Sequence, residues 1–317
     1  MNPRRYYGLS DYFIERYGFK CFKLSIDGGF TCPNRDGSLS SKGCAFCSAS
    51  GSGEFSGVIL DGKKAETQDI DVQITSQIQL LSKKWSQVAK ASHPRFIGYF
   101  QNYTNTYKPI EELERLYTQA MNQTDILGIA IATRPDCISK EHVSLFKKVN
   151  VMWVELGLQT IHDDKAIWMN RHYGYPQFLE TFQKLNSEDI RVVVHVMVGL
   201  PGESKSDFLE SVKQISHLKP FGIKFHMLNI LEGTPLAEMY HQNPFELLTM
   251  KAYIEWIVEA IELLDESIVI HRLTGDGEKN ALIAPKWILN KRAVLNGINK
   301  SLAEKNIWQG KSKANSE

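Results

Sequence analysis

The sequence has no apolar run long enough to cross a membrane. Its most apolar stretch, Val192–Leu200, is interrupted by His195 and falls far short of the roughly 20 residues that a transmembrane helix needs. The first residues, MNPRRYYGLSDYF, contain no apolar segment of the kind found in signal peptides. We therefore expect a cytoplasmic protein without a membrane segment.

The 317 residues also lack a strong excess of either charge. The formal net charge is +1, which does not indicate a strongly basic nucleic-acid-binding protein. The basic residues gather at the two ends: six against three acidic residues in 1–35, and seven against two in 286–317. Two interpretations stay open, because such ends can form a patch for a phosphate backbone or can simply be solvated and lysine-rich.

The five cysteines do not include the ligands of an ordinary structural zinc site. Cys32, Cys44 and Cys47 lie within 16 residues, in GFTCPNRDGSLSSKGCAFC, whereas Cys21 and Cys137 stand alone. Structural zinc usually takes four ligands, such as two C-x-x-C pairs. Three thiolates instead leave one corner of a 4Fe-4S cluster open for chemistry. The spacing favours an iron–sulfur cluster, with zinc and unligated thiols as alternatives, and we expect Cys21 and Cys137 to be small buried side chains.

Short apolar runs alternate with amphipathic segments over most of the chain, which predicts a parallel sheet with helices between its strands. The expected strands are Phe22–Ile26, Arg95–Phe100, Ile126–Ala132, Met152–Leu158, Arg191–Val198 and Gly222–Asn229. The expected helices cover Asp69–Ala91 and segments that begin near Pro109, Ser139, Pro176 and Ser204. The fold class is therefore α/β, a partial (βα)6 barrel of the TIM type. A cysteine loop directly after the first strand of such a barrel is well placed for catalysis.

Four segments are expected along the chain. They are an N-terminal extension (1–20), the partial barrel (21–248), a C-terminal extension that caps the barrel (249–310) and a disordered tail (311–317). Within the C-terminal extension we expect a helix over Thr249–Asp265, a strand over Ser267–His271 and a helix over Asn290–Lys305.

Six stretches in order resemble the radical SAM enzymes, between about Tyr12 and Gln309: GFTCPNRDG, CAFCSASGSGEF, YFQNYTNTY, VELGLQTIHD, HVMVGLPGES and HRLTGDGEKNALIAPKW. Within these enzymes the chain is similar to the branch of the elongator catalytic subunit, and there to the bacterial YhcC/YtqA group. The usual signature is C-x3-C-x2-C, but here eleven residues separate Cys32 from Cys44, and the elongator-like branch also has a long first gap. The resemblance implies that Cys32, Cys44 and Cys47 bind a 4Fe-4S cluster. It also implies that S-adenosylmethionine chelates the fourth iron and is reductively cleaved to a deoxyadenosyl radical.

The resemblance further implies contacts to S-adenosylmethionine. They are Phe46 near the adenine, Gln101, Asn102 and Thr104 at the amino group, Glu155 and Gln159 near the ribose and methionine, Arg171 at the carboxylate, and Gly199 and Gly202 in a turn that approaches the adenine. Structural alternatives stay open for each. Glu155 can be a satisfied buried group, Arg171 a surface cation, and the glycines can serve an ordinary turn.

Relatives in the elongator-like branch act on the wobble uridine of tRNA. The resemblance therefore implies conversion of a carboxymethylaminomethyl group on that uridine to aminomethyl. It also implies an electron donor such as flavodoxin or ferredoxin and a partner tRNA methyltransferase. An anticodon loop offers an unstacked base that can enter a pocket. Two rival classes stay open: a radical SAM enzyme acting on a small molecule, and a non-catalytic, zinc-stabilised RNA-binding protein.

Overall fold

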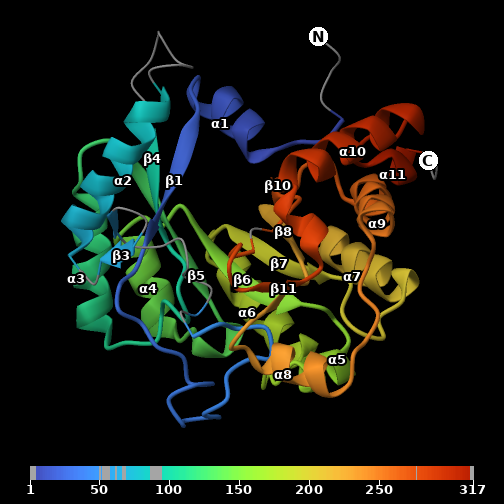
Figure 1. Cartoon of the computed structure of the whole chain (residues 1–317). Coiled ribbons are helices and arrows are strands. Elements are labelled where there is room, and N and C mark those ends of the chain that lie inside the picture. Colours follow the sequence, from blue (N-terminus) through green and yellow to red (C-terminus); the bar gives the residue numbers. More distant parts are fainter. Residues whose placement is uncertain are drawn as a thin grey trace.

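The computed structural model describes residues 5–49, 51, 58–60, 63–65, 69–85, 95–275 and 277–314. Its centre is a sheet of seven parallel strands, in the order β1-β4-β5-β6-β7-β8-β10, curled into an open half-barrel (Figure 1). The strands are β1 (Cys21–Ile26), β4 (Arg95–Phe100), β5 (Ile126–Thr133), β6 (Trp153–Gln159), β7 (Val192–Val198), β8 (Gly222–Met227) and β10 (Val269–Arg272). The predicted α/β partial barrel is confirmed.

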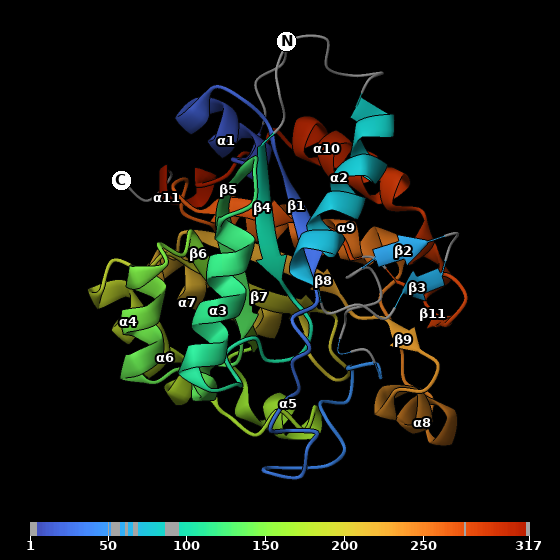
Figure 2. The ribbon, with the colours of Figure 1, turned by 90° about the vertical axis from the view of Figure 1, so that its left-hand side faces the viewer.

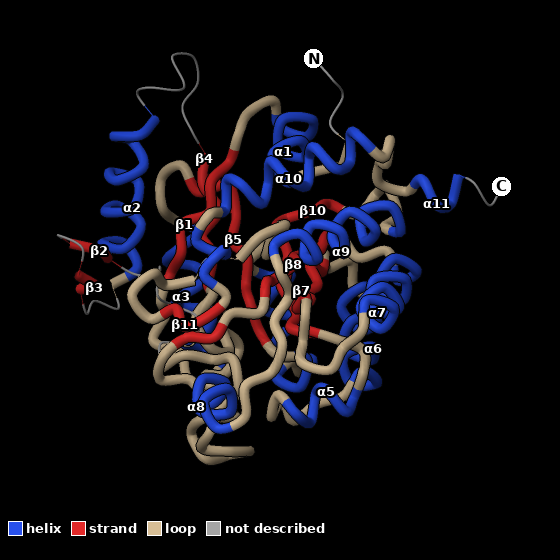
Figure 3. Tube along the Cα trace, turned by 45° about the vertical axis from the view of Figure 1, so that its right-hand side comes forward, coloured by secondary structure: helices blue, strands red, loops and turns tan. Residues whose placement is uncertain are grey.

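Helices cover the outer face of the sheet (Figures 2 and 3). They are α2 (Ile70–Trp85), α3 (Ile110–Met121), α4 (Lys140–Lys148), α6 (Tyr175–Ser187), α7 (Lys205–Leu218) and α9 (Met250–Leu263). Serine caps fix two of the expected helix starts. The Ser204 hydroxyl, for example, accepts a hydrogen bond from the backbone N–H of Asp207. The last part of the expected Asp69–Ala91 helix, residues 86–91, lies outside the described residues.

The strand side chains alternate between the helix-covered face and the barrel interior. In β6, Val154, Leu156 and Leu158 belong to the large hydrophobic core beneath the helices. Glu155 and Gly157 face the other way and line a cavity inside the half-barrel. This alternation is why an apolar strand can deliver a carboxylate to the interior.

A helix outside the predicted set closes one end of the barrel. In α1 (Leu9–Tyr17), Tyr12 and Phe13 are buried against Ile97, Trp153 and Val193, which lie near the starts of their strands. In Figure 1, α1 lies at the top and the cysteine loop, in blue, lies at the bottom. The N-terminal ends of the strands are therefore plugged, and the open end of the barrel is where the strands finish.

The expected six strands become seven because part of the C-terminal extension joins the sheet. β10 follows α9 and pairs in parallel with β8, with Val269 opposite Gly222. The extension thus begins with a further helix–strand unit that continues the sheet, and α10 (Lys291–Glu304) packs against α9. Lys311–Ala314, within the expected disordered tail, forms the short helix α11, and residues 315–317 lie outside the described residues.

The remaining elements are short. β2 (Val58–Leu60) pairs with β3 (Lys63–Ala65), and β9 (Ile230–Leu231) pairs with β11 (Leu282–Ala284). Two short helices, α5 (Asp163–Trp168) and α8 (Pro235–Gln242), follow β6 and β9, and 3-10 turns cover Pro135–Cys137 and Lys286–Leu289. Among the described residues, no helix has the length and apolar character needed to cross a membrane.

Candidate active site

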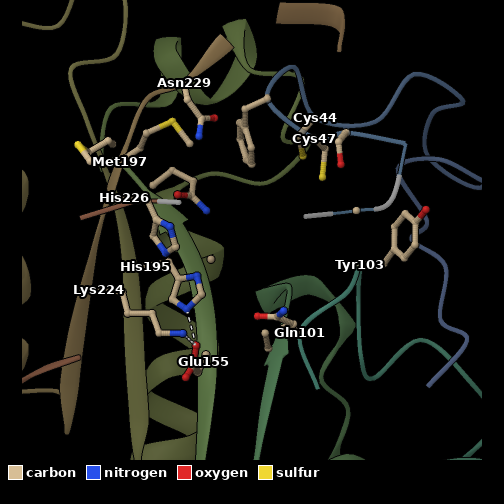
Figure 4. Close-up of a pocket in the computed structure, with 18 of the residues that line it drawn as sticks. Cys44, Cys47, Gln101, Tyr103, Glu155, His195, Met197, Lys224, His226 and Asn229 are labelled. Carbon is tan, nitrogen blue, oxygen red and sulfur yellow. Dashed lines mark hydrogen bonds and ion pairs between the residues drawn. The ribbon is translucent and has the colours of Figure 1, made fainter. Parts of the chain in front are cut away.

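A cavity of about 680 Å³ opens at the C-terminal end of the half-barrel. Its walls come from the interior faces of β1, β4–β8 and β10 and from the loops that follow these strands. Figure 4 shows Glu155 low in this cavity and the sulfur atoms of Cys44 and Cys47 near its top. This is the end at which barrel enzymes carry their active sites.

All three clustered cysteines reach the cavity. Cys32 lies in the loop after β1, and Cys32, Cys44 and Cys47 each contribute to the lining. A hydrogen bond from the backbone N–H of Cys47 to the carbonyl of Cys44, 3.0 Å long, closes the C-x-x-C turn. Asn34 Nδ2 donates to the Cys44 sulfur at 3.3 Å. The loop thus folds back as the spacing predicted, and brings three cysteines into the lining of one cavity.

The arrangement of these thiols suits a cluster. Within the described ranges, no three His, Cys, Asp or Glu side chains converge on the position of one metal ion. A 4Fe-4S cluster needs no such convergence, because each thiolate binds a different iron. The other cysteines are outside the cavity lining and half-buried, not fully buried as expected. Burial raises the pKa of Cys21 and of Cys137 to about 12, so both are protonated thiols at neutral pH.

Five of the residues expected to contact S-adenosylmethionine line the same cavity: Phe46, Gln101, Thr104, Glu155 and Gln159. The hydroxyl of Thr104 is buried and has no hydrogen-bond partner among the described residues, so it can bond to a molecule in the cavity. Asn102 is buried too, but it is not among the lining residues. The structure therefore separates Asn102 from Gln101 and Thr104, the other two residues expected at the amino group.

Glu155 is the centre of a polar cluster low in the barrel. Its Oε1 accepts hydrogen bonds from Lys23 Nζ and Trp153 Nε1, each at 2.9 Å. Its Oε2 accepts from Tyr99 Oη at 2.7 Å and from Lys224 Nζ. His195 Nε2 lies 2.7 Å from the same oxygen. Because a carboxylate has about four lone-pair sites, these protein groups saturate it.

Glu155, expected near the ribose and methionine of S-adenosylmethionine, lines the cavity, but its carboxylate is bonded to the protein itself. Burial by itself would raise the pKa of Glu155, but the charges of Lys224 and Lys23 and the hydrogen bond with His195 outweigh burial and hold that pKa well below its usual value. Burial lowers the pKa of His195 to about 4, so this imidazole is neutral at neutral pH. Glu155 is therefore an ionised structural anion whose lone pairs are already used.

Arg171 also differs from the expectation. It is neither a cavity-lining group nor a surface cation, since its side chain is almost completely buried. Its Nη1 donates to the carbonyls of Leu158 and Thr160, and its Nε donates to the carbonyl of Tyr173 at 2.9 Å. These two nitrogens thus hold the end of β6 in place. The buried Nη2 has no hydrogen-bond partner among the described residues, and the expected pairing with a cofactor carboxylate stays a prediction.

Gly199 and Gly202 form a turn after β7 and are not among the residues that line the cavity. Their φ angles are 83° and 70°, which side chains rarely adopt. A Cβ on Gly199 would also come within 2.7 Å of Leu248. Next in the chain, Glu203 accepts a hydrogen bond from Thr160, and burial raises its pKa to about 7. The turn by itself explains both glycines, which is the alternative interpretation, and the expected approach to the adenine stays a prediction.

Sequence reasoning missed the basic side chains of the cavity. Of the described residues in its lining, five are basic and Glu155 is the one acidic residue; the basic residues are Arg35, Arg134, Lys224, Arg272 and Lys291. A signal existed for Lys224, which stands between Ile223 and Phe225 in an apolar strand, as Glu155 does in β6. The cavity lining thus combines three thiols with five basic side chains, of which Arg134 is paired with Asp136 and Lys224 with Glu155.

Known proteins resemble this chain over most of its length. Residues 32–215 match the Radical SAM superfamily, and residues 220–304 match the Radical_SAM C-terminal domain. The chain is 37% identical to the uncharacterized protein YtqA of Bacillus subtilis, over 97% of this chain and 92% of that protein. It is 25% identical to elongator complex protein 3 of Bos taurus, over 58% of this chain and 33% of that protein.

Among solved structures, the archaeal Methanocaldococcus infernus Elp3 with an N-terminal deletion superposes with a TM-score of 0.68 and 18% identity. The match covers 91% of this chain and 64% of that one. It shows that the two proteins share a fold.

Proposed function

Because this chain belongs to the radical SAM superfamily, we propose that Cys32, Cys44 and Cys47 hold the 4Fe-4S cluster and that S-adenosylmethionine binds beside it. The observation that carries this proposal is that three cysteines line one cavity. When bound and reduced, the two cofactors of this superfamily supply a carbon radical that removes a hydrogen atom from the substrate. The protein positions both molecules and excludes water from them.

The cavity residues have the chemistry that S-adenosylmethionine requires. Phe46, inside C-x-x-C, offers an aromatic surface beside the thiols, and Gln101, Thr104 and Gln159 offer hydrogen-bonding groups in the same lining. In this proposal, backbone and side-chain groups of these residues bind the cofactor. Glu155 instead supports the walls, because its carboxylate bonds to protein groups, and Arg171 does so through Nε and Nη1, which donate to backbone carbonyls.

For the substrate we propose the wobble uridine of tRNA, with conversion of its carboxymethylaminomethyl group to aminomethyl. The likeness to elongator complex protein 3 supports this choice. The mouth of the cavity adds chemical support. The Arg35 guanidinium lies 5.7 Å from the centre of the Tyr103 ring, and Arg35, Tyr103 and Lys291 all line the cavity. Aromatic rings beside basic side chains are the usual surface for an unstacked base and its phosphates.

The proposed reaction needs two further proteins. An electron donor such as flavodoxin or ferredoxin would reduce the cluster, and a tRNA methyltransferase would use the aminomethyl product. Neither is needed to test the chemistry, because a chemical reductant can replace the donor.

The test uses the full chain, purified and reconstituted anaerobically with iron and sulfide. It is mixed with S-adenosylmethionine, dithionite and tRNA that carries carboxymethylaminomethyluridine, and the wobble nucleoside is analysed by mass spectrometry. The proposal expects loss of the carboxymethyl mass, with no change in reactions that contain Cys44→Ala. If S-adenosylmethionine is cleaved while the nucleoside stays unchanged, both in vitro and in a deletion strain, the tRNA substrate is wrong.

A further inference from the structure

One cysteine of the proposed cluster site accepts a hydrogen bond from a buried amide side chain. Asn34 comes two residues after Cys32 in the cysteine loop, and its side chain is completely buried. Its Nδ2 donates to the sulfur of Cys44 at 3.3 Å and to the backbone carbonyl of Asn170 at 2.6 Å. An amide nitrogen carries two hydrogens, so these two acceptors use both of them. The side chain of Asn34 therefore connects the cysteine loop with the segment that follows α5.

The orientation of this amide follows from its neighbours. The carbonyl of Asn170 can only accept a hydrogen bond, so the nitrogen of the amide has to face it, whereas the reversed amide would place two oxygens against each other. The Oδ1 atom of Asn34 is buried and has no hydrogen-bond partner in the described part of the chain, so it does not determine the orientation. The sulfur of Cys44 therefore faces an N–H group of Asn34 and not its oxygen.

The backbone on both sides of Cys44 is held by the same segment after α5. The N–H group of Ala45 donates to the carbonyl of Met169 at 2.8 Å. The side-chain Nδ2 of Asn170 donates to the carbonyl of Gly43 at 2.6 Å. The sulfur of Cys44 and the amide that bonds to it are therefore attached to one frame of backbone hydrogen bonds. Such a frame fixes the direction of the N–H group toward the sulfur.

We propose that Asn34, through its hydrogen bond to the sulfur of Cys44, raises the reduction potential of the 4Fe-4S cluster. This inference rests on the proposed function, in which Cys44 is a ligand of that cluster. Reduction adds one electron from the external donor, and part of the added charge falls on the thiolate sulfurs. An N–H dipole directed at a thiolate stabilises this charge, and hydrogen bonds to sulfur are one of the factors that set cluster potentials. Asn34 is thus a positioning residue that makes the cluster easier to reduce.

The test is a redox titration of the reconstituted full chain without S-adenosylmethionine, in which EPR measures the reduced cluster at each potential. Asn34→Leu keeps a similar volume and removes the donor. At a fixed potential it should shift the cluster about tenfold toward the oxidised form, the usual effect of one hydrogen bond to a charged group, which lowers a one-electron midpoint by about 59 mV. Asn170→Gly is the matched control. It removes the side-chain bond to Gly43, accepts the φ of 55° and keeps the carbonyl that Asn34 uses, so the wild-type midpoint should remain.

The outcomes separate this inference from the proposed function. A wild type that takes up no 4Fe-4S cluster overturns both. A cluster whose midpoint is the same in the wild type and in Asn34→Leu overturns the tuning role alone. An equal fall in Asn34→Leu and Asn170→Gly also overturns it, because the loosened loop and not the lost N–H group would then be the cause.

A variant that takes up no cluster does not end the test. Asn34→Ala replaces Asn34→Leu if the latter fails in this way. If both fail, pulsed EPR of the reduced wild type with ¹⁵N in its asparagine side chains decides the question. A coupling between the cluster and an asparagine ¹⁵N sustains the hydrogen bond to Cys44, and the absence of any such coupling overturns it.

Discussion

Replacing Glu155 with alanine should destabilise the fold much more than the loss of one side chain's packing would suggest. Its carboxylate is fully buried, and the Lys224 side chain that bonds to it is 6% exposed. Lys23, the second cation, is 20% exposed and can turn toward water when its partner is gone. Lys224 cannot turn toward water in this way. The substitution Glu155→Ala therefore leaves Lys224 as a buried charge and leaves two hydrogen-bond donors, Tyr99 Oη and Trp153 Nε1, without their acceptor.

The magnitude follows from the burial of the pair. Removing one partner of a buried ion pair costs about 3–5 kcal/mol, because the other charge stays desolvated. Urea unfolding of the cluster-free protein at neutral pH, followed by tryptophan fluorescence, measures the loss in unfolding free energy. Glu188→Ala is the matched control. The Glu188 side chain is 45% exposed and its partner Lys147 is 51% exposed, so this change should cost less than about 1 kcal/mol.

The effect also has a defined pH dependence. The pKa of Glu155 is held well below its unfolded value of 4.5, since Lys224, Lys23 and His195 outweigh the effect of burial. A carboxyl of this kind stabilises the fold above its unfolded pKa, and the stabilisation is lost as the pH falls through the folded pKa. The difference between wild type and Glu155→Ala should therefore be complete at neutral pH and should shrink below pH 4.5.

Two results would refute this reasoning. One is that Glu155→Ala lowers the unfolding free energy by no more than Glu188→Ala does. The other is a Glu155→Ala, Lys224→Met double variant that is no more stable than Glu155→Ala, because removal of the stranded cation should restore part of the loss.

Three further predictions follow from the site. Cys44→Ala should abolish the brown chromophore of the reconstituted protein while Cys137→Ala retains it, and the visible absorbance of the two variants decides this. Glu203→Gln should be increasingly more stable than wild type as the pH rises. Burial raises the pKa of Glu203 from 4.5 in the unfolded chain to about 7 in the folded one, so the wild type loses stability as the pH rises from 4.5 to 7, and the Gln variant does not. Urea unfolding midpoints of both proteins, measured below pH 4.5 and above pH 7, provide the check. Arg171→Lys should cost about 1–3 kcal/mol for each carbonyl at the end of β6 that loses its donor, and an unchanged unfolding free energy would contradict this role.

Most of the half-barrel could be predicted because each strand is a short apolar run bounded by polar residues. Arg95–Phe100, for example, has the same bounds in the sequence prediction and in β4. The place of β10 could not be predicted in this way. Its four residues have the pattern of a strand, and that pattern predicts a strand but not its neighbour in the sheet. The pairing with β8 depends on how α9 crosses back over the sheet. The plug formed by α1 was missed for a similar reason, since Tyr12 and Phe13 contact residues distant in sequence.

The site shows the same division between local pattern and distant contact. The cysteine spacing is local, and it correctly brought three thiols to one cavity. Glu155 was recognisable as a polar residue in an apolar strand, but its partner Lys224 lies 69 residues away. The burial of Arg171, in contrast, could not be predicted, and it excludes the surface cation that was the alternative interpretation. Positive φ angles at Asn170 and His172, of 55° and 63°, accompany a backbone turn that directs its guanidinium to the end of β6, and the letters MNRHY do not signal that turn.

The basic ends of the sequence acquire a definite geometry in the fold. Arg5 Nη1 donates to Asn306 Oδ1 at 3.1 Å, so the two ends lie side by side, on the same side of the molecule as the α1 plug (Figure 1). Helix α10 connects this region to the cavity, because Lys291 at its start lines the cavity and Lys305 follows its last turn. Its 14 residues span about 21 Å at 1.5 Å per residue. A phosphate backbone that used both Lys291 and the paired ends would therefore have to run along α10, and could not be held by a ring of charge at the cavity mouth alone.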